Sequence, residues 1–217
     1  MQAYRIAAYF APATSHPLWT AGVQWLEYDA AEHVESGRAA LPMASSPVNA
    51  DLTQTASRYG FHATLKPPLA LTEGSTPDNF YEAARSLVAN IPAFQMPRLS
   101  VQILDGFLAL RPASQTDPAT VALNALAETL VRGLDVFRSA EDDRQLEKRG
   151  ARLSTKQTAM LEQWGYPFVM ETWRFHMTLS RRLDQLNDRP ERELAKAREH
   201  FAAALEQPLW CQDVCLF

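Results

Sequence analysis

The stretch Phe61-His62-Ala63-Thr64-Leu65 returns almost unchanged as Phe175-His176-Met177-Thr178-Leu179. Four of the five positions are identical, and the middle position is apolar in both copies. Two of the five histidines of the chain, His62 and His176, therefore occupy duplicate settings. Imidazole is the side chain whose unperturbed pKa lies nearest neutrality, so a matched pair can supply one proton acceptor and one proton donor. The duplication therefore indicates two structural halves that each contribute a histidine to chemistry.

Both copies are predicted to form strands, and alternate side chains of a strand share a face. The apolar residues of each copy would then face the protein core, and the polar residues would face a cleft. A face of imidazole, hydroxyl and cationic groups is costly to bury without partners but suits the wall of a polar cleft. The predicted cleft-facing residues are His62, Thr64 and Lys66 in the first copy and Arg174, His176, Thr178 and Ser180 in the second.

The remainder of the chain predicts an α+β fold. Strands are expected over residues 4–10, 59–66, 99–104, 107–111, 172–180 and 209–217. Apolar residues at helical spacing predict helices after Pro17, from Pro77, over 118–137, from Ser154 to Gly165, and over 190–205. Each motif strand precedes a helix and a further strand, so we expect two lobes related by an approximate two-fold axis. The whole chain, 1–217, would form one bilobal domain, with a mainly helical stretch over 117–165 between the motifs.

Several local signals refine this outline. Asp105-Gly106 is typical of a β-hairpin turn. Pro67-Pro68 is expected to stop the first motif strand, because proline cannot donate to a strand ladder. Residues 36–57 show no sustained period and predict a loop that could move over a site. The charged stretch 141–152 predicts a solvated helix face.

Composition narrows the class of protein. The chain has 217 residues, a net charge of −4 and 47% hydrophobic residues, which is typical of a cytoplasmic globular protein. The acidic balance argues against a general nucleic-acid binder. Cys211 and Cys215 would be small buried side chains, since a strand holds them too far apart for a disulfide. Metal binding by the motif histidines remains an alternative, but neither motif offers a carboxylate or cysteine to complete a ligand set.

Two His-x-Thr motifs on strands, far apart in the sequence, resemble the two-histidine (2H) phosphoesterase superfamily. That group includes bacterial RNA 2′,3′-cyclic phosphodiesterases and tRNA-ligase-associated phosphodiesterases. The segments 58–68, 106–112, 164–167 and 174–179 resemble, more narrowly, a bacterial branch associated with phosphonate degradation. Members of that branch usually continue through a further short strand, whereas this chain ends at Phe217.

The resemblance implies a bilobal (LigT-like) fold, with two antiparallel-rich sheets flanking a central cleft and helices outside. It also implies hydrolysis of a cyclic phosphodiester without a metal or other cofactor. One motif histidine would accept a proton from water and the other would protonate the departing sugar oxygen, but the sequence does not decide which does which. Hydrogen bonds to the non-bridging phosphate oxygens would come from Thr64 and Thr178.

The expected substrate in that branch is 5-phosphoribosyl 1,2-cyclic phosphate, which opens to a ribose bisphosphate. Lys66 and Arg174 would bind its second phosphate, with Arg111 and Tyr59 as weaker candidates. An RNA 2′,3′-cyclic phosphate end is the alternative substrate. A non-catalytic nucleotide-binding module is the alternative of a different class.

Overall fold

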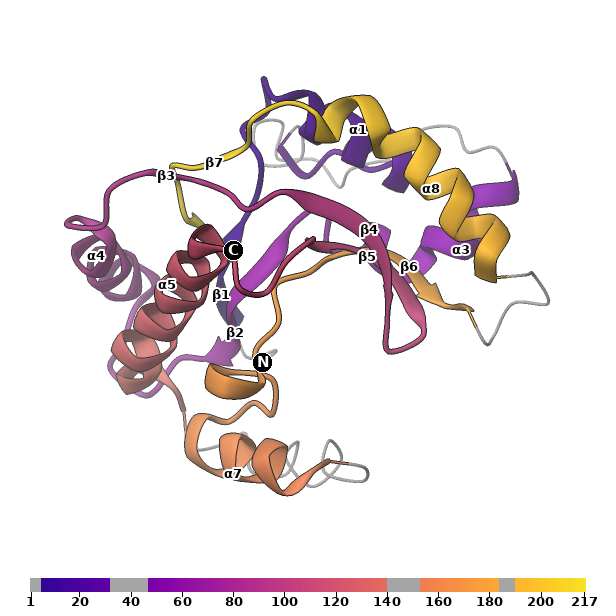
Figure 1. Cartoon of the computed structure of the whole chain (residues 1–217). Coiled ribbons are helices and arrows are strands. Elements are labelled where there is room, and N and C mark those ends of the chain that lie inside the picture. Colours follow the sequence, from indigo (N-terminus) through magenta and orange to yellow (C-terminus); the bar gives the residue numbers. More distant parts are fainter. Residues whose placement is uncertain (1–4, 32–46, 140–152, 184–189) are drawn as a thin grey trace.

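The computed structural model of the protein describes residues 5–31, 47–139, 153–183 and 190–217. These residues form six α-helices and a set of mostly antiparallel strands (Figure 1). The strands are β1 (Arg5–Phe10), β2 (Ala63–Ala70), β3 (Phe94–Gln95), β4 (Leu99–Leu104), β5 (Phe107–Pro112), β6 (Met177–Arg182), β7 (Trp210–Cys211) and β8 (Cys215–Leu216). The helices are α1 (Pro17–Leu26), α3 (Pro47–Ser57), α4 (Pro77–Val88), α5 (Pro118–Leu134), α7 (Thr155–Trp164) and α8 (Pro190–Leu205). Two short 3₁₀ turns, η1 (Asp135–Phe137) and η3 (Met170–Thr172), complete the set.

One six-stranded sheet carries the strands of both halves, in the order β4-β5-β6-β2-β1-β8. The motif strands β2 and β6 are neighbours at its centre, where Ala63 pairs with Met177. This confirms the α+β class with antiparallel pairing. The two motif strands were predicted to lie in separate sheets, but both belong to the six-stranded sheet, because they hydrogen-bond directly to each other. The remaining strands, β3 and β7, form a separate two-stranded ribbon.

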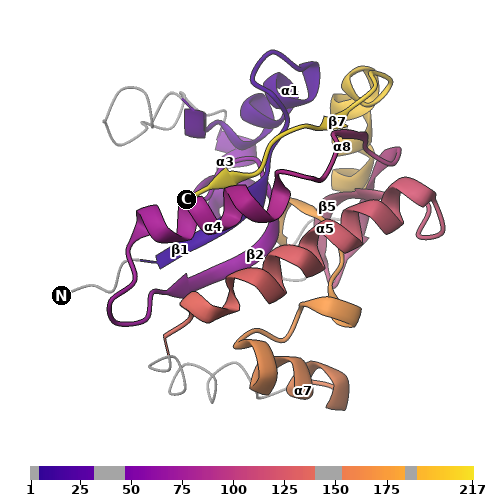
Figure 2. The same ribbon diagram turned by 90° about the vertical axis from the view of Figure 1, so that its left-hand side faces the viewer.

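Helices from distant parts of the chain cover the sheet in two groups. Figure 1 shows α4 and α5 together near β2, and α1, α3 and α8 together near β4 and β6. Figure 2 shows α4 and α5 running alongside each other, with α7 set apart below α5. The apolar residues of both motif copies lie in one continuous core and are at most 3% exposed, as alternation along each strand predicts.

Capping and turn residues begin and end the elements where the sequence predicts. The side chains of Thr76 and Ser154 each form a capping box at the start of α4 and α7. Gly165 ends α7 in the left-handed conformation, with φ of 70°. In the β4–β5 turn, Asp105 and Gly106 both have positive φ, as the hairpin prediction requires.

The first motif strand does not stop at Pro67-Pro68 but continues to Ala70. The register of β1 against β2 shifts between Ile6 and Ala8, and the two prolines lie opposite this irregularity. A β-bulge leaves residues outside the regular ladder, so prolines without an N–H can be accommodated there.

The predicted loop over residues 36–57 is wrong in its second half. Residues 47–57 form α3, whose side chains Leu52 and Ala56 are buried one turn apart. The segment is rich in Ala, Ser and Thr, so its apolar face has only a weak signature in the sequence. Residues 36–46, and the whole of the predicted charged helix face over 141–152, lie outside the described part of the chain.

The C-terminal segment is not one strand. Its β7 portion pairs with β3, whereas β8 pairs with β1 in the main sheet. Cys211 and Cys215 therefore belong to different sheets, and both are free thiols. The second motif strand also differs from its predicted range, because Met170–Thr172 is a 3₁₀ turn and regular pairing begins at Met177.

Candidate active site

The two His-x-Thr motifs come together on one face of the central sheet. The middle residues of the two motifs pair with each other in an antiparallel arrangement. This register places His62 across from Thr178 and His176 across from Thr64. Residues directly opposite in such a pair share a face, and diagonal neighbours lie roughly 7–8 Å apart. The two imidazoles are therefore diagonal neighbours, close enough for one phosphoryl group to lie between them.

Neighbouring strands extend the same face on either side. Thr64 pairs with Tyr9 of β1. On the other side, β5 pairs Ala109 with Thr178, and the next step of that register brings Arg111 beside His176. The result is a row of polar side chains that crosses four strands.

Both imidazoles are held by the same local hydrogen bond. Nδ1 of His62 lies 3.1 Å from the carbonyl oxygen of Gly60, and Nδ1 of His176 lies 2.8 Å from that of Arg174. Each carbonyl belongs to the residue two positions earlier, so the geometry repeats with the motif. When Nδ1 carries the proton and donates it to this carbonyl, Nε2 of the neutral ring is free to accept another.

Burial shifts the titration of both histidines. It lowers the pKa of His62 below its usual 6.5, the hydrogen bond to Gly60 opposes this, and the charge of His176 lowers the pKa further. Burial also lowers the pKa of His176, with Arg174 opposing through its carbonyl and Arg111 reinforcing the effect through its charge. Both rings are thus biased toward the neutral form that can accept a proton.

Aromatic rings contact the two histidines differently. The ring centroids of Tyr9 and His62 lie 4.1 Å apart, and those of Phe107 and His176 lie 5.8 Å apart. Tyr9 is 7% exposed, and burial, together with the nearby Tyr59 and Tyr166 hydroxyls, raises its pKa to about 12. Its phenol is therefore a neutral hydrogen-bond donor at any working pH.

A cavity of about 370 Å³ opens beside His176. Its wall includes Thr64 from β2 and a set of residues from the β4–β5 hairpin and the segment after α7. The indole of Trp173 closes one side by donating a hydrogen bond of 3.0 Å to the carbonyl oxygen of Thr64. The wall includes Thr64, Asp105, Phe107, Tyr166, Phe168, Trp173, Arg174, His176 and Arg182.

The guanidinium of Arg174 lines this cavity, and that of Arg111 lies beside His176. Arg174 is exposed and lies 3.8 Å from the Asp105 carboxylate, a loose ion pair. Arg111 donates to Gln102, but its Nε is buried without a hydrogen-bond partner among the described residues. Burial and the charge of Arg174 both lower the pKa of Arg111, and the Asp105 carboxylate opposes them. The two cations therefore lie near each other, and a further anion beside them would relieve their repulsion.

Lys66 does not follow the predicted alternation. It pairs with the core residue Ala8, whereas Thr64 pairs with Tyr9, because the register shifts between these two pairs. The shift turns Lys66 away from the motif face. We therefore correct the prediction that Lys66 points with His62 and Thr64.

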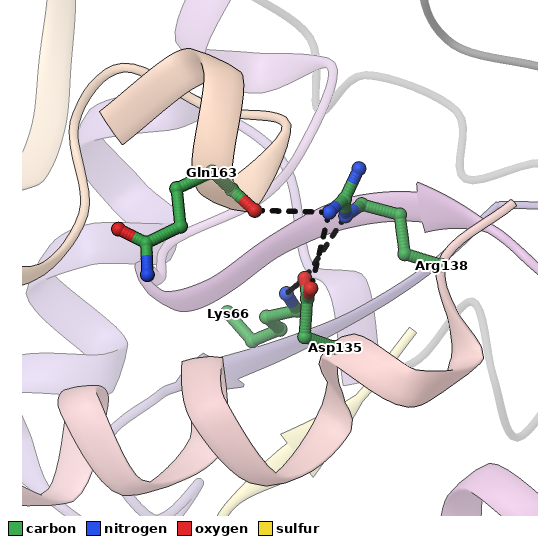
Figure 3. A network of polar contacts seen from close by, with 4 residues as sticks. All are labelled: Lys66, Asp135, Arg138 and Gln163. Atoms are coloured by element: carbon green, nitrogen blue, oxygen red, sulfur yellow. Dashed lines mark hydrogen bonds and ion pairs between the residues drawn. The ribbon is translucent and has the colours of Figure 1, made fainter. Parts of the chain in front are cut away.

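Lys66 is buried and instead belongs to a partly buried network of polar contacts (Figure 3). Its Nζ lies 3.2 Å from Asp135, and its side chain is 2% exposed. Arg138 donates two hydrogen bonds to the same carboxylate and a third, of 3.1 Å, to the carbonyl oxygen of Gln163. The network ties β2 to η1 and to the end of α7, just before the residues that line the cavity.

Tyr59 is the remaining sequence-predicted candidate. Tyr59 is 63% exposed and lies near Tyr9, outside the cavity wall. His16 caps α1, and His200 contacts the carbonyl oxygen of Ala21. His33 is not among the described residues. Within the described ranges, no group of three or more His, Cys, Asp or Glu side chains could hold a metal ion.

Sequence reasoning missed several residues of the site, which the fold brings in from other elements. Arg182 lines the cavity, and alternation from His176 along β6 could have indicated it. Tyr166 falls in a segment that carried the family resemblance, but nothing local showed its direction. The missed residues are Tyr9, Phe107, Tyr166, Phe168, Trp173 and Arg182.

None of the described helices combines the length and apolar character that crossing a bilayer requires.

Comparisons with known proteins identify relatives of the chain. A family model described as "Protein of unknown function (DUF1045)" matches residues 64–217. Two curated relatives, from Laribacter hongkongensis and Janthinobacterium sp., are each named ribose 1,5-bisphosphate phosphokinase PhnN and are 36% identical to this chain over 206 and 203 residues. The matches cover 94% and 93% of this chain but 46% and 44% of the relatives, so the chain spans about half their length. No solved structure matches the chain significantly.

Proposed function

Because this chain belongs to the DUF1045 family, whose function is unknown, we propose its function from the site itself. The protein is a metal-independent phosphodiesterase that opens the cyclic phosphate of a small phosphorylated sugar. The observation that carries this proposal is the diagonal placement of two His-x-Thr motifs, each with its imidazole anchored through Nδ1 to a carbonyl two residues earlier.

The paired motifs suit an in-line displacement at phosphorus. A neutral imidazole takes a proton from the attacking water through Nε2, and a protonated imidazole gives one to the departing sugar oxygen. Thr64 and Thr178, each across from the histidine of the other motif, donate hydrogen bonds to the non-bridging oxygens, where negative charge builds up. Each proton transfer by a positioned side chain contributes roughly 10²–10⁴-fold to the rate.

A substrate with a second phosphate agrees with the cations beside the cavity. Arg174 and Arg111 offer guanidinium donors without a tight ion pair, and a dianion would fit between them. We propose 5-phosphoribosyl 1,2-cyclic phosphate, in phosphonate catabolism, as the substrate. Breaking its bond from phosphorus to O2 leaves ribose 1,5-bisphosphate, the compound in the name of the curated relatives.

We do not assign the phosphokinase activity in the relatives' names to this chain. The relatives are about twice its length, so the named activity can reside in their other half. A common nucleotide-binding loop, Gly-x-x-x-x-Gly-Lys-Ser/Thr, occurs nowhere in the sequence. A relative that joined both halves would carry out two consecutive steps, first opening the ring and then phosphorylating the product.

The test is turnover of cyclic phosphates followed by phosphorus NMR with a chelator present. His62→Ala and His176→Ala should each lower kcat by roughly 10²–10⁴-fold. His16→Asn is the matched control, since it removes a histidine that does not line the cavity and keeps a side chain that can cap α1. Wild-type rates in both motif variants would refute the proposal, as would loss of activity on adding the chelator alone.

The same purified protein decides between the alternatives. Incubation with ATP and ribose 1,5-bisphosphate should give no phosphorylated product; its appearance would assign the kinase activity to this chain. RNA ending in a 2′,3′-cyclic phosphate should turn over more slowly than the sugar substrate, because the chain is acidic overall. Tight nucleotide binding without turnover would favour a binding module.

A further inference from the structure

The two halves of the motif site are not equivalent in their surroundings. The cavity of about 370 Å³ is lined by His176 and by Thr64, but not by His62 or Thr178. On the other side, the ring of Tyr9 lies 4.1 Å from that of His62. We infer that the cavity holds the sugar of the substrate, so that His176 is the general acid and His62 is the general base. This assignment rests on the proposed function and adds a direction to it.

In-line displacement makes the direction chemically meaningful. The attacking water and the departing oxygen lie on opposite sides of phosphorus, and the sugar is attached on the departing side. A water molecule needs little room, whereas a sugar phosphate needs a cavity. The side of the phosphate with the cavity is therefore the leaving side, and the imidazole on that side belongs to His176.

The cavity has the size and lining that a phosphorylated sugar requires. Its volume lies in the range of about 300–1,000 Å³ that is usual for small-molecule sites. Phe107, Tyr166 and Trp173 offer aromatic surface to a sugar ring, and Arg174 stands at the wall for a second phosphate. The Asp105 carboxylate also lies at the wall, where the guanidinium of Arg174 partly offsets its charge.

Through Arg111, binding of the second phosphate would affect protonation of the general acid, His176. Arg111 lies beside His176 in the register, and its buried Nε has no hydrogen-bond partner among the described residues. In the free protein, the charge of Arg111 disfavours the imidazolium form of His176. A bound phosphate would neutralise that charge, so the substrate itself would promote protonation of the general acid.

The proton balance of the step is complete. Water loses a proton to Nε2 of His62 as its oxygen bonds to phosphorus. The bond from phosphorus to the sugar oxygen breaks, and this oxygen takes the proton from Nε2 of His176. After turnover His62 is protonated and His176 is neutral, and exchange with solvent restores the starting forms.

A substrate whose leaving group needs no proton separates the two roles. Bis(4-nitrophenyl) phosphate releases nitrophenolate, so loss of the general acid should matter little. His176→Ala should lose at least about 10²-fold on the cyclic sugar phosphate but less than about 10-fold on the aryl diester. His62→Ala should lose about 10²–10⁴-fold on both. The reverse pattern would overturn the assignment.

The pH profile on the cyclic substrate gives a second measurement that does not depend on the aryl diester. Removal of a general base abolishes the fall of kcat/KM toward acid pH, and removal of a general acid abolishes the fall toward alkaline pH. We expect the acid-side fall to disappear in His62→Ala and the alkaline-side fall in His176→Ala. Opposite changes would refute the assignment, whereas wild-type rates in both variants would refute the proposed function itself.

A matched pair of arginine variants tests where the sugar lies. Arg174→Ala should lower kcat/KM more for the 5-phosphorylated substrate than for the same cyclic sugar without that phosphate. Arg98→Ala is the control, because Arg98 forms an exposed ion pair with Glu206 and does not line this cavity. Equal losses on the two substrates in Arg174→Ala would place the sugar outside the cavity.

Discussion

Replacing Asp135 by asparagine should destabilise the protein far more than replacing its partner Lys66 by methionine. In Asp135→Asn the ammonium of Lys66, only 2% exposed, would stay buried without an anion. Removing one partner of a buried ion pair costs about 3–5 kcal/mol, and the 20% exposure of Asp135 favours the lower end. In Lys66→Met the apolar stem stays, and Asp135 keeps its hydrogen bonds to Arg138. The loss should then be about 1 kcal/mol.

The assay is urea unfolding followed by tryptophan fluorescence, with the double variant included. Lys66→Met combined with Asp135→Asn removes both charges of the pair, so it should be more stable than Asp135→Asn alone. A coupling energy of about 1–3 kcal/mol is expected for residues in direct contact. Lys66→Met would refute the reasoning if it destabilised the protein as much as Asp135→Asn does. Strict additivity in the double variant would refute it as well.

The same variant separates a structural lysine from a substrate-binding one. Because Lys66 pairs with Asp135 and not with the motif face, Lys66→Met should leave kcat/KM nearly unchanged once it is folded. Arg174→Ala serves as the comparison, since Arg174 lines the cavity. A folded Lys66→Met that loses activity only on the 5-phosphorylated substrate would restore Lys66 as a substrate contact.

Further predictions concern pH and packing. Burial lowers the pKa of both His62 and His176 below 6.5. When kcat/KM is measured across a buffer series, it should therefore peak on the acid side of pH 6.5. A peak above pH 7 would contradict this expectation. Because both pKa values are lower in the folded protein, the unfolded chain binds more protons. The free energy of unfolding should therefore be highest above pH 6.5 and should fall as the pH drops through the pKa values of the two histidines in the folded protein. Replacing both histidines should flatten this dependence. A Cβ at Gly22 would lie 2.2 Å from a ring atom of Phe61. Gly22→Ala should therefore lower the free energy of unfolding, measured by heat or urea, by about 1–3 kcal/mol. An unchanged unfolding midpoint would contradict this close packing.

The histidine site shows how far local patterns reach. Alternation along each motif correctly predicts that Phe61, Leu65, Phe175 and Leu179 face the core. The same rule fails at Lys66, because a register shift depends on how β1 lies against β2. A bulge has no reliable signature in one strand, since it is a property of the pair.

By itself, the sequence of this protein determined the paired His-x-Thr strands, their buried faces, the helix caps and the Asp105-Gly106 hairpin. These features depend on a few neighbouring residues, whose preferences act wherever the segment lies. Only the tertiary structure decided that β2 and β6 pair directly, that Lys66 turns to Asp135, and that the cavity is lined by His176 and not by His62. Strand partners, register shifts and cavity walls join segments far apart in the sequence, and their free energies exist only once those segments meet.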